Sequence, residues 1–433
     1  MIVDRRLVLA ILTASLACPV VARTPDSVVG AWRGLWTKGG DDLPVAVRFA
    51  LGPDGLSGAF DSDALQVTGI PFSQVEQRGT HLRFVLRGDD SATVFDGDIQ
   101  DDEISGTLTE GADIGRFRLQ RDPAPTSTVR TEAVTATVGD VALSGSLLLP
   151  HRPGVYPSVV FLHGSGPEGR FANRYLAQRF AEAGFAALIS DKRGVGQSGG
   201  DWRQAGFDDL AADAAAWVRL LRTRVDIDPG RIGLYGHSQG GTIAPLAAEA
   251  AGGLAFVIAS AASGLSPAET EIYSLDNSLG VPDLPPDEAR DARAFVRGLV
   301  DVAYGGADRA TFDRLAATFR SRAWYFDPPS EDDSYWAFSA RISSYDPLPR
   351  WRALAAPALL LYGERDERTP PAASIAAIRA ALAEGGRAAP TVRIYPGADH
   401  AFHLLSTPGG WPRRVPDYAQ TVVAWAREMV GPG

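Results

Sequence analysis

Ser238 stands at the centre of the pentapeptide Gly236-His237-Ser238-Gln239-Gly240, whose spacing suits nucleophilic chemistry. The short apolar run at 231–235 predicts a buried parallel strand before it, and the alanine- and leucine-rich run at 241–251 predicts a helix after it. A serine on such a sharp turn presents its hydroxyl at the carboxyl edge of the sheet, and the glycines let strand and helix approach closely. We therefore predict that Ser238 is a nucleophile rather than part of a chance glycine-rich turn.

A serine hydroxyl needs a neighbouring base at neutral pH, and the chain holds six histidines. Four of them are expected to serve elsewhere: His81 in the N-terminal region, His151 in an edge-strand turn, His163 opening a glycine turn, and His237 directed away from the serine hydroxyl. His400 lies in the loop 396–402 after the last predicted strand, at the same sheet edge as Ser238. We predict His400 as the base, with His403 on the next turn as the alternative.

The base in turn needs a carboxylate that fixes its tautomer and stabilises its protonated form. Asp366 lies three residues beyond Gly363, where a predicted strand ends. Glu364 and Glu367 are alternatives, although the two are more readily explained as surface charges. Because Ser238, Asp366 and His400 each follow a strand end, the three together are far more specific than any one of them.

A tetrahedral intermediate carries a negative oxygen that preorganised N–H groups must meet. The backbone N–H of Gln239, directly after the nucleophile, is one predicted donor. The second is expected from the glycine-rich turn 163–166, where the N–H of Ser165 is favoured over that of Gly166. Such a turn alone would be an ordinary loop, and its position after a central strand strengthens the prediction.

The remaining motifs predict neither a cofactor nor a metal. The glycine-rich stretch 191–198 lacks the spacings of phosphate-binding loops, so Asp191 and Arg193 are expected to brace this loop. No spacing of histidines with carboxylates indicates a metal site.

Alternating strand and helix patterns from residue 129 onwards predict a mainly parallel sheet with crossover helices, which would position these residues. Strands are expected at 129–138 and 141–149, both as edge strands, and at 158–162, 185–190, 231–235, 254–259, 358–363 and 392–395. Helices are expected at 174–183, 207–222, 241–251, 372–383 and 418–429. The predicted class is therefore α/β.

The alternation of strand and helix patterns is interrupted at about 265–349, where the sequence becomes acidic, aromatic and helix-like. An insertion at this point of the sheet predicts a helical cap above the site, and a structural extension packed elsewhere is the alternative. Five aromatic residues are expected either to shape a pocket or simply to bury the cap: Trp324, Tyr325, Phe326, Tyr335 and Trp336.

Residues 23–124 have a different character, with alternating segments at 45–49, 82–86 and 115–119 between turn signals at 53–55 and 96–97. This pattern predicts a small antiparallel β-domain, either a sandwich or a barrel. The segment 30–36 resembles the first strand of a lipocalin-like barrel, whose aromatics would form a core or line a ligand cavity. The proline-rich break at 122–128 predicts the boundary with a second domain at 125–433.

The composition, 45% hydrophobic and 22% charged over 433 residues, is that of a globular protein with two domains. A formal net charge of −10 argues against a nucleic-acid-binding surface. Residues 1–22 combine a charged start, a short apolar run and small residues, which predicts a signal peptide and export to the periplasm or the medium. The apolar run is too short for stable membrane insertion. Lipidation of Cys18, the one cysteine, is a weaker alternative.

The motifs together resemble secreted bacterial α/β-hydrolases of the serine carboxylesterase type with a β-rich N-terminal domain. The resemblance rests on the order Ser238, Asp366, His400 and on the segments 163–167, 191–196, 236–241, 363–366 and 397–400. It implies hydrolysis of small-molecule esters with short to medium acyl chains and without a cofactor. Acyl thioesterases and peptidases are related branches, and a non-catalytic protein that binds apolar ligands is the competing class.

Overall fold

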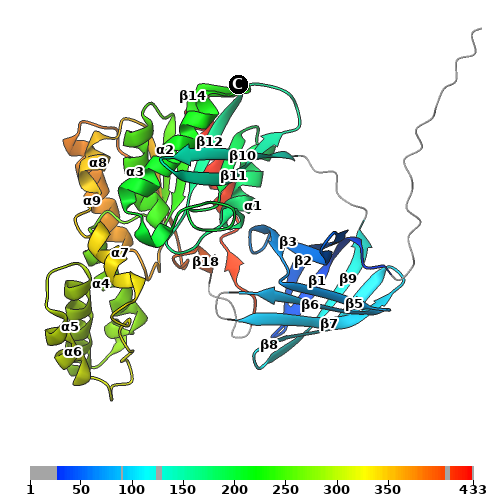
Figure 1. The fold of residues 1–433 in the computed structure, drawn as a ribbon, viewed down its shortest axis with the longest axis horizontal. Helices are drawn as coiled ribbons and strands as arrows, with labels where there is room; N and C mark the ends of the chain where they lie inside the picture. Colours follow the sequence, from blue (N-terminus) through cyan, green and yellow to red (C-terminus); the bar gives the residue numbers. More distant parts are fainter. Residues whose placement is uncertain (1–26, 89–90, 123–128, 405–409, 432–433) are drawn as a thin grey trace, which may run out of the picture.

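The computed structural model describes residues 27–88, 91–122, 129–404 and 410–431. Two large β-sheets organise these residues, one formed by residues 30–122 and the other by residues 129–395 (Figure 1). The predicted signal peptide and the predicted domain boundary at 124–125 lie outside the described residues.

The larger domain is built on a sheet of eight strands in the order β10-β11-β13-β12-β14-β15-β16-β17. Their bounds are β10 Val129–Val138, β11 Val141–Pro150, β12 Tyr156–Leu162, β13 Ala186–Ser190, β14 Ile227–His237, β15 Phe256–Ser260, β16 Ala358–Gly363 and β17 Thr391–Tyr395. The strands from β13 to β17 are parallel, and β10 and β11 run antiparallel to their neighbours. All eight predicted strands are present. The prediction that β11 is an edge strand is wrong, because β11 pairs with both β10 and β13.

Helices cover both faces of this sheet, because alternate residues of the buried strands face opposite sides. Val160 packs toward α2 Phe207–Arg222, α3 Gln239–Ala251 and α9 Pro371–Glu384, whereas Val159 packs toward α1 Arg174–Glu182 and α10 Tyr418–Val430. The remaining short elements are η1 Arg170–Asn173, η2 Trp202–Gln204 and α8 Leu348–Ala353. In the described part of the chain no helix has the length and apolar character needed to cross a bilayer.

A helical insertion lies between β15 and β16, as the interruption of the sequence pattern predicts. It consists of α4 Pro267–Ser278, η3 Val281–Asp283, α5 Pro286–Ala303, α6 Arg309–Ala317 and α7 Ser334–Ile342, and α5 and α6 project away from the sheet (Figure 1). The five aromatic residues singled out above belong to the insertion's own hydrophobic cluster. The rings of Trp324 and Phe326 lie 6.0 and 5.3 Å from the ring of Phe295. These contacts favour the simpler expectation, that the aromatics bury the insertion.

The N-terminal domain is one antiparallel sheet of nine strands in the order β4-β3-β2-β1-β9-β8-β7-β6-β5. The strands are β1 Gly30–Lys38, β2 Asp41–Gly52, β3 Gly55–Ser62, β4 Val67–Pro71, β5 Gln74–Arg78, β6 His81–Arg87, β7 Ala92–Gln100, β8 Glu103–Glu110 and β9 Asp113–Asp122. The two edge strands, β4 and β5, are joined by Phe72 and Ser73 alone, so the sheet must curl until its edges meet at this link. The result is a half-barrel, and the alternative of a two-sheet sandwich is wrong.

The inside of the half-barrel is filled by aromatic and aliphatic side chains. Trp32 and Trp36 of β1 are fully buried there, and the ring of Trp36 lies 4.5 Å from that of Phe95. This packing agrees with the expectation that these tryptophans form a core. The turn expected at 96–97 is wrong, because both residues lie within β7. Gly97 is needed there for close packing, since a Cβ would lie 2.4 Å from the carbonyl oxygen of Ser105.

Candidate functional site

Ser238 lies on the sharp turn between β14 and α3. Its backbone has φ 55° and ψ −120°, a region that costs a non-glycine residue free energy. A Cβ on Gly236 would lie 2.2 Å from the carbonyl oxygen of Gly240, and a Cβ on Gly240 would lie 2.6 Å from that of His163. Glycine is therefore required at both positions for helix α3 to begin directly against the ends of β14 and β12.

His400 connects Ser238 to Asp366 through both of its ring nitrogens. Its Nδ1 lies 2.8 Å from Oδ1 of Asp366, and its Nε2 lies 3.0 Å from Oγ of Ser238. Asp366 is 1% exposed. Because a carboxylate can only accept, Nδ1 carries the proton in this contact and Nε2 is free to accept the serine O–H. The structure thus brings together the three residues expected to act on one another.

The backbone of the following turn fixes the carboxylate of Asp366. Its Oδ1 also accepts the N–H groups of Arg368 at 2.9 Å and Thr369 at 2.7 Å. The alternative acids do not reach the imidazole ring in the structure. Instead, Glu364 accepts the N–H of Gly397 at 2.8 Å, and Glu367 accepts the N–H of His400 at 3.3 Å. These two carboxylates therefore hold the backbone of the histidine loop.

The other candidate histidines have separate partners. Nε2–H of His163 donates to the carbonyl oxygen of Ser190 at 2.6 Å, and burial lowers the pKa of His163 to about 4. The ring of His237 lies 5.1 Å from that of His400, with Nδ1 3.3 Å from Oγ of Ser260. Burial holds the pKa of His237 well below its usual value, and the nearby His400 ring lowers it further. His403 lies in the strand after the loop and faces Asp399 at 3.7 Å.

The two predicted oxyanion donors lie at the start of α3 and in the loop after β12. Gln239 is the first residue of α3, where backbone N–H groups have no partner within the helix. Ser165 is exposed, and the next residue, Gly166, has φ +85°. Nζ of the buried Lys192 donates to the carbonyl oxygens of Gly164 at 2.8 Å and Gly166 at 3.2 Å, and to Oε1 of Gln239 at 3.0 Å.

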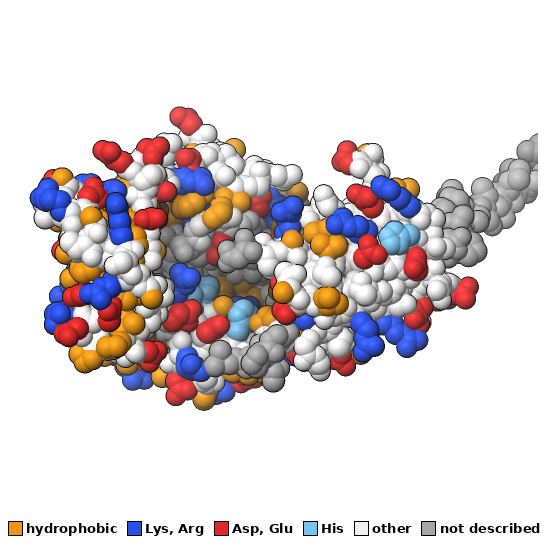
Figure 2. All heavy atoms as spheres, turned by 90° about the horizontal axis from the view of Figure 1, so that it is seen from below, with side chains coloured by type: hydrophobic (Ala, Val, Ile, Leu, Met, Phe, Trp, Pro, Cys, Tyr) orange, Lys and Arg blue, Asp and Glu red, His pale blue; other side chains and the backbone are white. Residues whose placement is uncertain are grey.

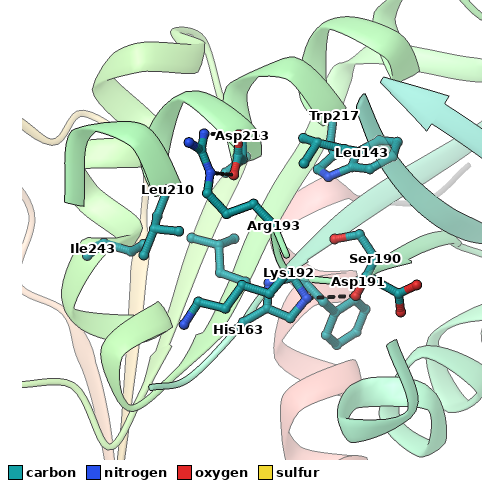
Figure 3. Close-up of a pocket in the computed structure, with 13 residues that line it drawn as sticks. Leu143, His163, Ser190, Asp191, Lys192, Arg193, Leu210, Asp213, Trp217 and Ile243 are labelled. Atoms are coloured by element: carbon teal, nitrogen blue, oxygen red, sulfur yellow. Dashed lines mark hydrogen bonds and ion pairs between the residues drawn. The ribbon is translucent and has the colours of Figure 1, made fainter. Parts of the chain in front are cut away.

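The side chains that follow β13 diverge to different partners (Figure 3). Asp191 accepts the guanidinium of Arg170 at 2.6 Å, while Arg193 reaches Asp213 of α2 at 2.6 Å. In Figure 3, Arg193 extends upward to Asp213, whereas Lys192 extends downward, toward the side where His163 is labelled. Asp191 and Arg193 therefore brace this loop, as the sequence indicates.

Sequence reasoning missed several residues that act on the site from its surroundings. Lys192 and Glu168 hold the loop after β12, where Glu168 accepts the N–H of Gly164 at 2.7 Å. From α4, the hydroxyl of Tyr273 donates to the carbonyl oxygen of Asp366 at 2.8 Å. The scarcity of lysine in the sequence could have drawn attention to Lys192. No comparable signal marks Glu168 or Tyr273, because their partners are backbone atoms, four residues away for Glu168 and 93 residues away for Tyr273.

The N-terminal domain contacts the segment that follows His400. This segment forms a hairpin of β18 His403–Leu404 and β19 Arg413–Arg414. Trp411 inserts into the core of the half-barrel, with its Nε1–H on the carbonyl oxygen of Trp36 at 3.1 Å and its N–H on Asp41 at 2.9 Å. Arg413 also pairs with Asp41 at 2.8 Å. The β-domain therefore holds the hairpin attached to the histidine loop.

One face of the molecule is hollowed between the helical insertion and the β-domain, and histidine side chains show in the hollow (Figure 2). Among the described residues, no group of three or more histidine, cysteine, aspartate or glutamate side chains is arranged to hold a metal ion. The site described above offers a serine hydroxyl, an imidazole and a buried carboxylate that are joined by hydrogen bonds.

Comparisons with known proteins find similar chains among curated proteins and solved structures. The chain is 33% identical over 105 residues to the quorum-quenching protein AidA of Acinetobacter baumannii, covering 24% of this chain and 34% of that protein. It is 27% identical over 136 residues to the uncharacterized peptidase YtmA of Bacillus subtilis, covering 31% and 52%. The chain thus spans between a third and about half of the length of these curated relatives. An esterase from Pyrococcus furiosus has a TM-score of 0.45 at 17% identity, covering 72% of this chain and 96% of that one.

A family model decides the assignment. The model of the alpha/beta hydrolase family matches residues 159–411, which is more than half of the chain. The match runs from β12 through the serine turn, the insertion and the histidine loop. This chain therefore belongs to the alpha/beta hydrolase family.

Proposed function

We propose that this protein is a serine hydrolase that cleaves carboxylic esters through an acyl-enzyme intermediate. The observation that carries the proposal is the continuous chain of hydrogen bonds from Ser238 through His400 to the buried Asp366. Hydrogen-bonded serine, histidine and carboxylate groups of this kind act as nucleophile, base and orienting group in acyl transfer.

In the first half of the proposed reaction, Oγ of Ser238 attacks the ester carbonyl carbon while Nε2 of His400 takes the serine proton. Asp366 keeps the Nδ1 proton in place and stabilises the charged imidazole. The carbonyl oxygen becomes an oxyanion that the N–H groups of Gln239 and Ser165 receive. When the tetrahedral intermediate collapses, the C–O bond to the alcohol breaks and Nε2 gives its proton to the leaving oxygen.

The second half repeats these steps with water. His400 removes a proton from water as the water oxygen attacks the acyl-serine, and the same N–H groups receive the new oxyanion. Collapse releases the carboxylic acid and returns the proton to Oγ of Ser238. Atoms balance without a cofactor, since water supplies the oxygen and both hydrogens.

The proposal is tested by hydrolysis of p-nitrophenyl esters of increasing acyl length, with Ser238→Ala as the matched variant. We expect turnover of short to medium chains, and a loss of about 10⁴-fold or more in the variant because the nucleophile is gone. Folded wild-type protein that is inert on every ester would contradict the proposal. Thioesters and peptides, which need only a different leaving group, would then be the next substrates.

We further propose that the protein is exported and acts as the chain that begins near Arg23, on the pattern of residues 1–22. The N-terminal sequence of protein recovered from the periplasm of a Gram-negative host tests this. Protein that remains in the cytoplasm with its first 22 residues intact would contradict it.

A further inference from the structure

Lysine is rare in this chain. Of the 42 lysine and arginine residues, only Lys38 and Lys192 are lysines. Both are buried, with exposed fractions of 8% and 3%. Lys38 forms an ordinary ion pair with Glu110 at 2.6 Å. Lys192 differs, since the three hydrogen bonds of its ammonium within the described residues all go to uncharged oxygens. Burying a charge on such partners is costly, which points to a role other than stabilisation.

We propose that Lys192 is a positioning residue that fixes the two halves of the oxyanion site relative to each other. Its ammonium joins the loop after β12, through the carbonyl oxygens of Gly164 and Gly166, to the start of α3, through the side chain of Gln239. The inference rests on the proposed function, because it assigns a role to Lys192 within that same site.

The geometry of the peptide group gives Lys192 control over the N–H of Ser165. The carbonyl of Gly164 and the N–H of Ser165 belong to one planar trans peptide, so they point in opposite directions. When the ammonium holds that carbonyl oxygen, it also fixes the direction of the Ser165 N–H. Glu168 holds the preceding peptide through the N–H of Gly164 at 2.7 Å. Two side chains thus set the orientation of consecutive peptide groups in this loop.

Only the ammonium form of lysine can make all three contacts. A charged amine has three N–H donors, whereas the neutral amine has two and turns a lone pair toward one of the oxygens. A guanidinium would not substitute well, because its donors lie in a plane at the end of a longer, wider group. This explains why lysine stands at this position in a chain that otherwise uses arginine almost throughout.

The surroundings of Lys192 make its charge sensitive to pH. Burial lowers the pKa of Lys192 to about 8, and the nearby Glu168 opposes that shift. His163 also faces it, and burial keeps His163 neutral at these pH values. From η2 comes the uncharged ring of Trp202, 5.3 Å from Nζ, and from α3 the uncharged Gln239. The adjacent Asp191 and Arg193 are paired with Arg170 and Asp213, respectively.

The first experiment compares Lys192→Met, which keeps the length of the side chain and removes its charge, with Lys38→Met as the matched control at the other buried lysine. For Lys192→Met we expect kcat on a p-nitrophenyl ester to fall by about 10- to 100-fold, less than the loss of a whole oxyanion donor. KM should change little, because the N–H groups of the oxyanion site bind a negative oxygen that forms only in the transition state. Lys192→Arg should not restore kcat. Lys38→Met should lower kcat far less than Lys192→Met, because Nζ of Lys38 lies over the ring of Trp411 and not at the oxyanion site.

The second experiment uses the wild-type protein alone. Lysine labelled with carbon-13 at Cε gives two NMR signals, which the Lys38→Met variant assigns, so the charge of Lys192 can be followed directly from about pH 6 to pH 10. We expect kcat to fall on the alkaline side with the same midpoint as the Lys192 signal. In Lys192→Met this alkaline fall should be absent.

These outcomes separate the inference from the function on which it rests. Wild-type protein without esterase activity would contradict the proposed function itself. An active wild type whose kcat stays constant while Lys192 loses its proton would overturn the role of Lys192, even if the methionine variant fails to fold. The same conclusion would follow if the alkaline fall persisted unchanged in Lys192→Met.

Discussion

The serine side of the site is built within the hydrolase domain, whereas the histidine side is also held by the β-domain. On the serine side, Ser238 and the loop after β12 are fixed by close backbone contacts and by Lys192. On the histidine side, the hairpin after His400 reaches into the half-barrel through Trp411.

The two halves of the site are therefore held in place by different parts of the molecule. On the serine side, the contact of Gly236 with Gly240 lies within the strand-turn-helix unit. The contacts of Gly240 with His163 and of Lys192 with Gly164 join segments of the same domain. The hairpin of the histidine side joins residues more than 300 positions apart, as in the bond from Gln66 to the carbonyl oxygen of Val415 at 2.7 Å. The β-domain is therefore expected to affect the base more than the nucleophile.

The largest effect is expected at Asp366, which orients the base. Asp366→Asn removes the negative charge that stabilises the protonated imidazole of His400, and its amide group does not hold the ring tautomer as strictly, so kcat should fall by about 10⁴-fold. Glu367→Gln is the matched control, because this carboxylate accepts the backbone N–H of His400 and does not bond to the imidazole ring. Since the amide oxygen of glutamine can still accept this N–H, kcat should fall by about fivefold or less. Equal losses of kcat in the two variants would mean that the ring contact has no special role.

Replacing a glycine by alanine should lower the free energy of unfolding more on the serine side than on the histidine side. Gly236→Ala on the serine side forces a Cβ against the carbonyl oxygen of Gly240, and we expect a loss of about 2–4 kcal/mol in the free energy of unfolding. Gly397→Ala on the histidine side meets open space and only the penalty of φ +68°, which is about 1 kcal/mol. Urea unfolding measures both values. A cost at Gly397 as large as that at Gly236 would contradict this contrast.

Trp411→Ala tests whether the β-domain supports the base. Removing the indole should destabilise the domain contact by about 3 kcal/mol and lower kcat by several-fold, because the hairpin follows His400 directly. Trp32→Ala is the control, since the hydrogen bond of Trp32 to Val28 lies within the β-domain. At a temperature where both variants are folded, Trp32→Ala should keep the wild-type kcat. Equal kcat values in the two variants would remove the proposed coupling.

The smallest effect on kcat is expected for a variant that changes the acid stability of the serine side. His163 has a folded-state pKa of about 4, below the ordinary value of 6.5. The unfolded chain therefore binds a proton first, and the free energy of unfolding should fall as the pH decreases from 6.5 to 4. His163→Asn lacks this titration, so its unfolding free energy should depend less on pH in that interval. Parallel pH profiles of wild type and variant would exclude His163 as the cause.

Much of the hydrolase domain could be predicted from its sequence, because buried parallel strands and amphipathic helices have strong local patterns. The bounds of α2 and β16 agree with the expected ranges. The turn predicted from Gly97 was wrong, since a glycine in a strand can allow close packing as well as form a turn. The closure of the half-barrel and the docking of Trp411 could not be foreseen, because they depend on contacts between distant parts of the chain.

The site shows the same division. Ser238, Asp366 and His400 follow strand ends, so topology alone predicts that they meet at one sheet edge. Lys192, Glu168 and Tyr273 contact backbone carbonyl oxygens and N–H groups. Because residues of almost every type have these groups, the sequence does not indicate the partners.

The central claim is that Ser238 carries the acyl group during turnover. Rapid acid quenching of the wild-type protein with p-nitrophenyl acetate, followed by intact mass and peptide mapping, tests it directly. We expect one acetyl group on the peptide that contains Ser238 and none on Ser238→Ala. An acetyl group on a different residue, or wild-type rates of hydrolysis by Ser238→Ala, would contradict the account.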